Sequence, residues 1–288
     1  MASTITLKRR IGSIRNTRQI TKAMEMVAAS KMRRAQEQAL RSRAYRDATY
    51  GLLTRLSTMS EVARQPLFSR RDVKTRLYVV VTSNSGLAGA YNANVLKMLT
   101  RDVMVDRDGG IKSQVIAIGN KGAQFARRAE HIELVAVYPS FGDQPTANDI
   151  RPVLNTIVEK YLSLEIDEVK LIYTLFKSNL VQLTTQSTLM PMTLEAKESS
   201  GSKFTNFEPD VESVLHFTGL RLIEAQLWQA VLEGLASEQS ARMLAMKNAT
   251  DNAGDLINEY TLVFNTARQA AITQELAEIS GGVEALKD

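Results

Sequence analysis

The sequence predicts an α/β protein: a long antiparallel coiled coil of the N- and C-terminal helices, plus a central doubly wound, mostly parallel αβ domain. All six prolines of the 288-residue chain lie in its middle, so both ends are open to uninterrupted helix. Apolar residues at both ends recur at helical spacing, whereas those in the middle form short β-rich runs. We expect domains at residues 1–58, 59–209 and 210–288.

The first helix is expected from about Thr4 to Thr58, a segment rich in Ala, Met, Arg, Lys and Gln. It has 13 basic and 3 acidic side chains, whereas residues 210–288 have 5 and 12, and these opposite balances indicate that the two ends associate. Its apolar stripe is narrow and made largely of small residues at spacings of mostly three and four: Ile11, Ile14, Ile20, Met24, Ala28, Met32, Ala35 and Ala39.

The last helix is expected from about Asp210 to Ser280, with Gly281 and Gly282 as its stop. Its stripe follows coiled-coil steps through Ala245, Ala249, Leu256, Tyr260, Val263, Ala267 and Ala270. If both helices start level at the central domain, Ile11 lies near Ile257 and the last helix outruns the first by about 16 residues, on the order of 24 Å. That tip must face something other than this chain.

The middle of the chain alternates strands with helices, which is typical of a parallel, doubly wound sheet. We expect four parallel strands, an antiparallel edge strand at Gln182–Met190 and a polar loop at Lys197–Lys203. The parallel strands are Arg76–Thr82, Gln114–Ile118, Glu133–Val137 and Val169–Phe176, and the helices between them are Asn92–Val103, Lys121–Ala129 and Asn148–Leu162.

No residue pattern predicts catalysis, a cofactor or a metal. The glycine turns at Ser83–Gly89 and Gly119–Gly122 follow strands but lack the spacing of dinucleotide and P-loop motifs, so tight turns are favoured over phosphate sites. The chain has no cysteine, and His131 and His216 are far apart, which argues against thiol and zinc chemistry. No hydrolase elbow or metalloprotease motif is present in the sequence.

The basic first helix has two readings. Clusters such as Lys8-Arg9-Arg10 fit the arm of a nucleic-acid binder. The apolar stripe, however, continues through the basic region from Ile20 to Ala39, and such an arm would not need it. A helix paired with a protein surface is therefore favoured. No apolar stretch approaches 18 residues and no secretory signal begins the chain, so we expect at most peripheral membrane association.

Long motifs at both ends carry a family resemblance. The segment Thr17–Gln36 (TRQITKAMEMVAASKMRRAQ) closely resembles the N-terminal signature of the γ subunits of bacterial F-type ATP synthases. The segments Leu235–Glu259 (LASEQSARMLAMKNATDNAGDLINE) and Ala267–Gly281 (ARQAAITQELAEISG) resemble that family's C-terminal signature. Ala88 stands where many relatives carry a cysteine, and no chloroplast-type insertion is present, so the resemblance does not imply thiol regulation.

The resemblance implies a central rotor shaft, present once per complex and without catalysis of its own. Its partners would be a surrounding ring of three α and three β subunits (α3β3), the ε subunit and the membrane-embedded c-ring. The shaft would couple c-ring rotation to conformational change in the catalytic β subunits. It would lie peripherally at the cytoplasmic face of the bacterial inner membrane, with no nucleic-acid partner.

The resemblance also implies positions of contact between shaft and ring. The N-terminal helix would pass the moving region of the β subunits at one group, and the C-terminal helix would face the ring at another. The groups are Lys22, Met24 and Glu25, and Arg242, Arg268, Gln269, Thr273 and Glu275. Two other classes stay open: a basic helical nucleic-acid binder, and a nucleotide-dependent enzyme built on the central domain.

Overall fold

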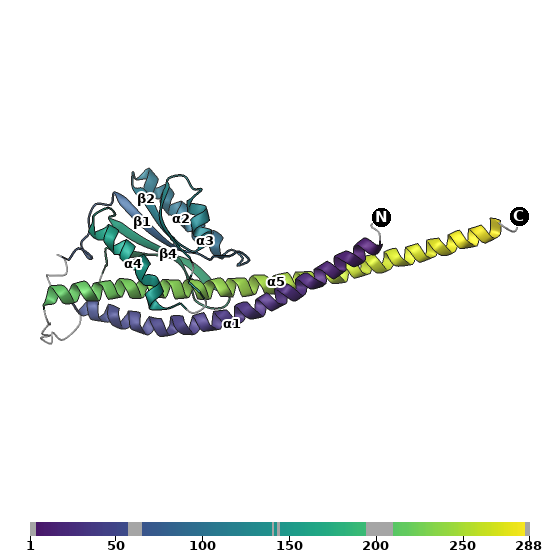
Figure 1. The fold of residues 1–288 in the computed structure, drawn as a ribbon, viewed down its shortest axis with the longest axis horizontal. Helices are drawn as coiled ribbons and strands as arrows, with labels where there is room; N and C mark the ends of the chain where they lie inside the picture. Colours follow the sequence, from purple (N-terminus) through teal and green to yellow (C-terminus); the bar gives the residue numbers. More distant parts are fainter. Residues whose placement is uncertain (1–3, 57–64, 140, 143–144, 194–209, 286–288) are drawn as a thin grey trace. The chain divides into compact units, whose positions relative to one another are not determined.

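The computed structural model describes residues 4–56, 65–139, 141–142, 145–193 and 210–285 (Figure 1). Two terminal helices and a central, mostly parallel αβ domain are present, which confirms the predicted fold class. The elements are α1 (Thr4–Leu56), β1 (Thr75–Val81), α2 (Tyr91–Asp108), β2 (Lys112–Ile118), α3 (Asn120–Ala126), β3 (Ile132–Tyr138), α4 (Ala147–Leu162), β4 (Glu168–Phe176), β5 (Gln182–Met190) and α5 (Val211–Ala285).

The described residues form two compact units. One comprises residues 28–242, with the whole αβ domain and the adjoining parts of α1 and α5. The other comprises residues 4–27 of α1 and 243–285 of α5. Helices α1 and α5 are therefore the only elements that contribute residues to both units, within the part of the chain that the structure describes.

The sheet has the strand order β3-β2-β1-β4-β5. Its first four strands are parallel, and β5 pairs antiparallel with β4. Parallel neighbours need crossover connections, which α2, α3 and α4 supply, whereas a short turn is enough to join β4 to β5. The edge strand β5 has the bounds that the sequence predicted.

Both faces of the sheet are covered. Alternate residues of a strand point to opposite faces, so β1 divides its apolar side chains between two cores. Leu77 and Val79 pack with residues of α4 and α5, whereas Tyr78 and Val80 pack with residues of α2 and α3. Because β1 is buried on both sides, its sequence is a continuous apolar run rather than an alternating one.

In the unit of residues 28–242, α5 is itself part of the sheet's cover. Its residues from Leu215 to Val231 include buried Leu222, Ile223 and Leu227, which belong to the same apolar core as β1 and α4. This part of α5 is buried on most of its circumference. Helix α5 is thus both one helix of the coiled coil and part of the layer that covers one face of the sheet.

In the other unit, α1 and α5 run antiparallel. The Thr250 hydroxyl donates to the Thr21 hydroxyl at 2.8 Å, and a Cβ atom on Gly254 would lie 3.7 Å from Nε of Arg18. This register places Ile11 about opposite Tyr260, so the expected pairing with Ile257 is wrong by about one helical turn. The expectation assumed that the two helices begin level, and they are offset.

The predicted end of α5 is also wrong. The helix continues through Gly281 and Gly282 to Ala285, because a glycine costs roughly 1 kcal/mol in a helix but ends it only where it adopts a left-handed conformation. The polar loop at Lys197–Lys203 and the domain boundaries near residues 58 and 209 lie outside the described residues and stay predictions. No described helix is long and apolar enough to span a membrane.

Candidate functional site

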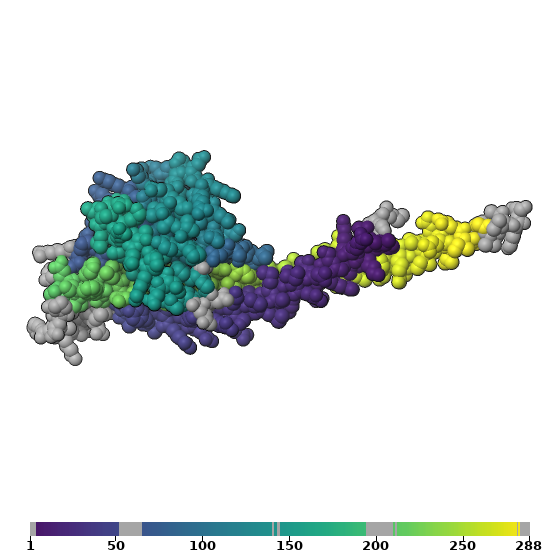
Figure 2. Space-filling model, viewed as in Figure 1, coloured from purple at the N-terminus to yellow at the C-terminus, as the bar shows by residue number. Residues whose placement is uncertain are grey.

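The final turns of α5 form the most exposed helical segment of the described chain. Every side chain from Arg268 to Ser280 is exposed. The apolar ones include Leu276 at 62% and Ile279 at 65% exposure. In the register set by Thr21 and Thr250, the beginning of α1 falls about opposite Ala267, so α1 has no residues to cover this segment. We call residues 268–280 the α5 tip (Figure 2).

Four of the predicted contact residues lie on the α5 tip. Arg268 and Glu275 make no ion pair with any described residue. The Thr273 hydroxyl donates to the backbone carbonyl of Gln269 at 3.0 Å, a bond within the helix that leaves the Gln269 side chain unengaged. These polar groups are therefore available to a partner. The exposed apolar residues around them indicate that the partner surface is partly apolar.

The three predicted residues on α1 lie together, about 20 residues of helix away from the α5 tip in the same unit. Lys22 and Glu25 form an ion pair at 3.1 Å, one helical turn apart. Met24 is half-buried beside them, and Met26, one turn after Lys22, is 60% exposed. The α1 group is thus a surface of mixed charge and exposed methionine rather than an extension of the tip.

Arg242 occupies a different environment. Its residue is only 9% exposed, and it pairs with Glu238 at 2.8 Å, one turn earlier on α5. Its guanidinium also donates to the Ser85 hydroxyl at 3.2 Å and to the carbonyl of Gly86 at 3.4 Å. Arg242 therefore joins α5 to the turn that follows β1, and a contact of this side chain with a surrounding ring stays a prediction.

The turn after β1 is held by its own side chains. Backbone N–H groups of such a turn must be free to bind phosphate, and those of Ser83 and of residues 119–122 are engaged within the chain. The N–H of Ser83 donates to Asn92 at 3.0 Å, and the N–H of Asn120, in the next turn, donates to Asn84 at 3.2 Å. The N–H of Gly122 donates to the Thr82 hydroxyl at 2.9 Å. The turn at Gly119–Gly122 is thus hydrogen-bonded to residues 82 and 84 at the end of β1.

Glycine is required where these turns meet. Gly119 has φ +98°, and a Cβ atom there would lie 2.1 Å from the carbonyl oxygen of Thr82. Gly234 serves the same purpose on α5, because a Cβ atom there would lie 2.8 Å from Cγ1 of Val81. The glycine pattern of the turn at Gly119–Gly122 therefore reflects close packing against Thr82.

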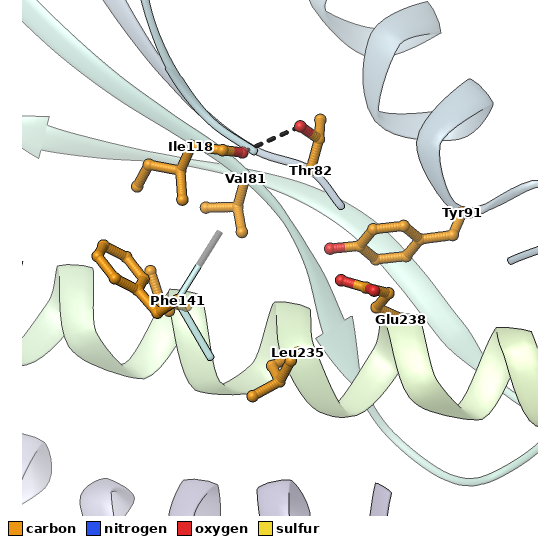
Figure 3. Close-up of a pocket in the computed structure, with 8 residues that line it drawn as sticks. Val81, Thr82, Tyr91, Ile118, Phe141, Leu235 and Glu238 are labelled. Carbon is orange, nitrogen blue, oxygen red and sulfur yellow. Dashed lines mark hydrogen bonds between the residues drawn. The ribbon is translucent and has the colours of Figure 1, made fainter. Parts of the chain in front are cut away.

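A small cavity of about 10 Å³ lies between β1 and α5 (Figure 3). Tyr91 points its hydroxyl toward the carboxylate of Glu238 across it. Burial, and then the negative charge of Glu238, raise the pKa of Tyr91 well above its ordinary value. A space of this volume holds at most about one water molecule, so it is too small for a nucleotide.

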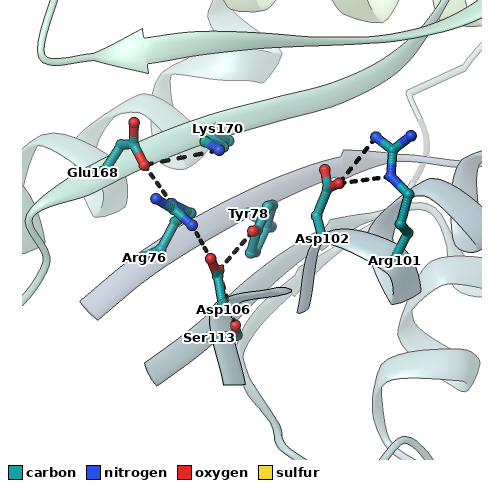
Figure 4. Close-up of polar contacts among 8 residues, drawn as sticks. All are labelled: Arg76, Tyr78, Arg101, Asp102, Asp106, Ser113, Glu168 and Lys170. Atoms are coloured by element: carbon teal, nitrogen blue, oxygen red, sulfur yellow. Dashed lines mark hydrogen bonds and ion pairs between the residues drawn. The ribbon is translucent and has the colours of Figure 1, made fainter. Parts of the chain in front are cut away.

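A buried charge network lies at the amino end of the strands (Figure 4). Arg76 of β1 is placed between Asp106 of α2 and Glu168 of β4, and forms ion pairs with both. Asp106 is 1% exposed and also accepts hydrogen bonds from Tyr78 at 2.6 Å and Ser113 at 3.2 Å. Desolvation by burial raises the pKa of Tyr78, so its hydroxyl stays protonated and donates.

No sequence motif predicted this network. A signal was present, because Arg76 begins an apolar strand and Asp106 ends a helix that returns to the same edge of the sheet. Elsewhere, no described group of three or more His, Cys, Asp or Glu side chains is placed to hold a metal ion. His131 is exposed, with φ +65°, and His216 makes an edge-to-face contact with Phe217.

Comparisons with known proteins agree on one family. A family model described as ATP synthase matches residues 3–286. The ATP synthase gamma chain of Glaesserella parasuis serovar 5 (strain SH0165) is 40% identical over 289 residues, which cover 99% of this chain and 100% of that protein.

Two solved structures share the fold. One is the central stalk and c-ring of Tetrahymena thermophila mitochondrial ATP synthase (TM-score 0.64, 24% identity, 80% of this chain and 99% of that chain). The other is the OSCP/F1/c-ring of Euglena gracilis mitochondrial ATP synthase in rotational state 3 (TM-score 0.69, 18% identity, 98% and 94%).

Proposed function

The chain belongs to the ATP synthase gamma chain family, and we propose that it is the central shaft that couples rotation of the c-ring to conformational change in three catalytic β subunits. The exposed α5 tip is the observation that carries this proposal. It combines exposed polar groups at Arg268 and Gln269, whose side chains have no partner among the described residues, with exposed apolar residues such as Leu276. A helix end of this kind needs an enclosing partner surface, and a ring of α and β subunits would supply one.

The shaft acts by differential contact. It changes the nucleotide affinity of a β subunit only insofar as it contacts the open and closed conformations of that subunit unequally. The α1 group at Lys22, Met24 and Glu25 and the α5 tip are two chemically different surfaces at different heights of the coiled coil. An asymmetric shaft presents such surfaces to each β subunit in turn.

The chain is proposed to do no chemistry of its own. The backbone N–H groups of Ser83, Asn120 and Gly122 are engaged in bonds within the chain, which disfavours the reading of the central domain as a nucleotide-dependent enzyme. The catalytic sites would belong to the β subunits. Calorimetry with millimolar ATP is expected to show no saturable binding to this chain.

The nucleic-acid reading is also disfavoured. From Ala28 onward the stripe through the basic part of α1 is buried within the chain, as Ala28, Met32, Ala35 and Ala39 show with exposures of at most 4%. The expected start of this stripe at Ile20 is wrong, because Ile20 is 60% exposed. The proposed partners are instead an α3β3 ring, the c-ring and the ε subunit, with one copy of this chain per complex. The proposed location is peripheral, at the cytoplasmic face of the bacterial inner membrane.

A reversible disulfide cross-link between shaft and ring tests the proposal. The chain has no native cysteine, so Gln269→Cys can be joined by a disulfide to one cysteine placed in a neighbouring β subunit. Rotation must carry this position past all three β subunits, so the tie is expected to abolish steady ATP turnover while nucleotide still binds. Reduction should restore turnover.

The matched control is Gln269→Cys without the β cysteine, which should turn over before and after oxidation. Continued multi-site turnover with the tie fully formed and α5 still helical around it would contradict the shaft function.

A further inference from the structure

Arg43 of α1 joins three elements at one point. Its Nε and Nη2 atoms donate to Oε1 of Glu233 on α5, at 3.1 and 3.0 Å. The same Nη2 atom donates to the backbone carbonyl of Phe176, the last residue of β4, at 3.3 Å. All three residues lie in the unit of residues 28–242. A single guanidinium of α1 therefore bonds both the other helix of the coiled coil, α5, and a strand inside the sheet, β4.

The surroundings of this contact are polar. Glu233 is 1% exposed, and its Oε1 atom also accepts from Gln229 at 2.6 Å. One turn along α5, the Ser237 hydroxyl donates to the carbonyl of Thr174 in β4 at 3.1 Å. The apolar cluster here is small, with Ala35, Phe176 and Ala236 as its buried members. Earlier in α5, by contrast, residues up to Val231 are embedded in the main apolar core.

The two kinds of contact resist different movements. Apolar burial is non-directional and scales with area, so it opposes separation more than turning. A fork of guanidinium N–H groups bonds only in a fixed orientation, and charge-assisted bonds are about twice as strong as neutral ones. Contacts that resist turning are what a shaft needs between its coiled coil and the domain attached to it.

We propose that Arg43, through Glu233 and the carbonyl of Phe176, is the positioning residue that transmits torque between α1 and the αβ domain, of which α5 is a layer. The proposal rests on the shaft function above. Loss of the guanidinium leaves the apolar core in place, so the chain still assembles with α5 fixed against the sheet, but α1 turns more freely against α5 and β4. Rotation is then no longer passed on in full.

The test uses the complete synthase in lipid vesicles, with Arg43→Met, which keeps an unbranched side chain and removes the fork. ATP hydrolysis is expected to persist while most ATP-driven proton pumping is lost. A second readout attaches a bead to the αβ domain through Lys112→Cys, an exposed position in a chain without native cysteine, with the α3β3 ring immobilised. Its thermal angular fluctuation should widen in Arg43→Met.

The matched control is Arg46→Met. Arg46 lies one turn along α1 with similar exposure, but among the described residues its fork bonds only the adjacent Asp47. This control should keep wild-type pumping and fluctuation. The conservative variant Arg43→Lys retains a charge beside Glu233 without the fork, and should lie between wild type and Arg43→Met. If Arg43→Met does not assemble, Arg43→Lys decides by the same two readouts.

Unchanged pumping per ATP hydrolysed and unchanged angular fluctuation would overturn the proposal, as would equal losses in Arg46→Met. Its failure is distinct from failure of the shaft function. The disulfide tie at Gln269 tests rotation with Arg43 intact, so a blocked wild-type rotor together with an unaffected Arg43→Met refutes the torque contact alone.

Discussion

Individual buried charges connect α2, β1, β2 and β4 at the amino ends of the parallel strands. Arg76 has a side chain only 13% exposed, and it lies between the carboxylates of Asp106 and Glu168. A buried cation is costly unless it is paired and hydrogen-bonded. Asp106 provides the more buried partner and at the same time connects α2 to β1 and β2 through Tyr78 and Ser113.

Asp106→Asn is expected to destabilise the chain by about 3–5 kcal/mol, because it leaves the buried Arg76 without one of its two charge partners. The measurement is the free energy of unfolding in urea. The control is Asp108→Asn, two residues away on the same helix, where the carboxylate is 72% exposed and pairs with Arg107. Loss of this exposed ion pair should lower the free energy of unfolding by less than about 1 kcal/mol. Equal effects of the two variants would show that the network does not stabilise the fold.

At the scale of elements, the register of α1 against α5 decides what each helix can contact. In the unit of residues 4–27 and 243–285, the Thr21–Thr250 hydroxyl pair and the approach of Arg18 to Gly254 define it. The same register leaves the α5 tip without a partner helix. Small residues such as Ala253, which is 5% exposed, let the two backbones approach closely.

Spin labels at Ile14 and Leu256 test this register. The two positions are nearly opposite each other, so their backbones should be about 10 Å apart, the usual spacing of packed helices. A label pair at Ile14 and Leu276 is the control, because 20 further residues of helix add roughly 30 Å. Pulsed electron paramagnetic resonance on the complex reports both distances. A long separation for the first pair would exclude the register.

The starts of α4 and α5 depend on carboxylates. Asp149 accepts hydrogen bonds from the backbone N–H and the hydroxyl of Thr146, and these bonds lower its pKa. Asp210 likewise accepts from the backbone and hydroxyl of Ser213, which lower its pKa. A carboxyl whose pKa is lower in the folded state stabilises the fold above its unfolded pKa of 3.8, and loses that effect as the pH falls through the folded value.

Stability is therefore expected to decrease as the pH falls below about 3.8, and less steeply in Asp149→Asn and Asp210→Asn. The measurement is thermal unfolding across this pH range, with hydrogen exchange at the first turns of α4 and α5. Each variant should also exchange faster at its own helix start at neutral pH. Identical pH profiles of wild type and variants would contradict the role of these carboxylates.

At the scale of the whole molecule, the proposed function depends on a partner that encloses the α5 tip. The tip exposes Arg268 and Gln269 together with apolar residues, and α1 does not extend to it. A guanidinium that bonds a carboxylate or backbone carbonyls of a ring subunit would form a charge-assisted hydrogen bond. The contact would form and break as the shaft turns.

Arg268→Leu with Gln269→Leu is expected to weaken both ATP synthesis and hydrolysis by the complete enzyme. The fold should survive, because both side chains are exposed. Arg101→Leu is a control for loss of a surface arginine, since the Arg101 side chain is 68% exposed and, within the described part of the chain, pairs only with the adjacent Asp102. Rates of synthesis and hydrolysis, with circular dichroism for helix content, check the outcome. Normal rates in the double variant would leave both residues without a role in the contact.

Helix and strand periodicity are local properties of the chain, so its helices and strands could be predicted before the fold was known. The confinement of proline to residues 66–209 and the spacing of the apolar stripe in α1 predicted two long helices, and β-rich runs predicted the five strands. The motifs at Thr17–Gln36 and Leu235–Glu259 predicted the family, which the comparisons confirm.

Contacts between side chains far apart in the sequence depend on the fold and could not be predicted. Arg43 and Glu233 are 190 residues apart, and neither differs from an ordinary helix-surface charge until the two helices are in register. Arg242 donates a hydrogen bond to Ser85 in the turn after β1, a contact that the sequence of its own helix does not predict. The offset of α1 against α5 likewise depends on the summed packing of both helices and the sheet, which no short segment encodes.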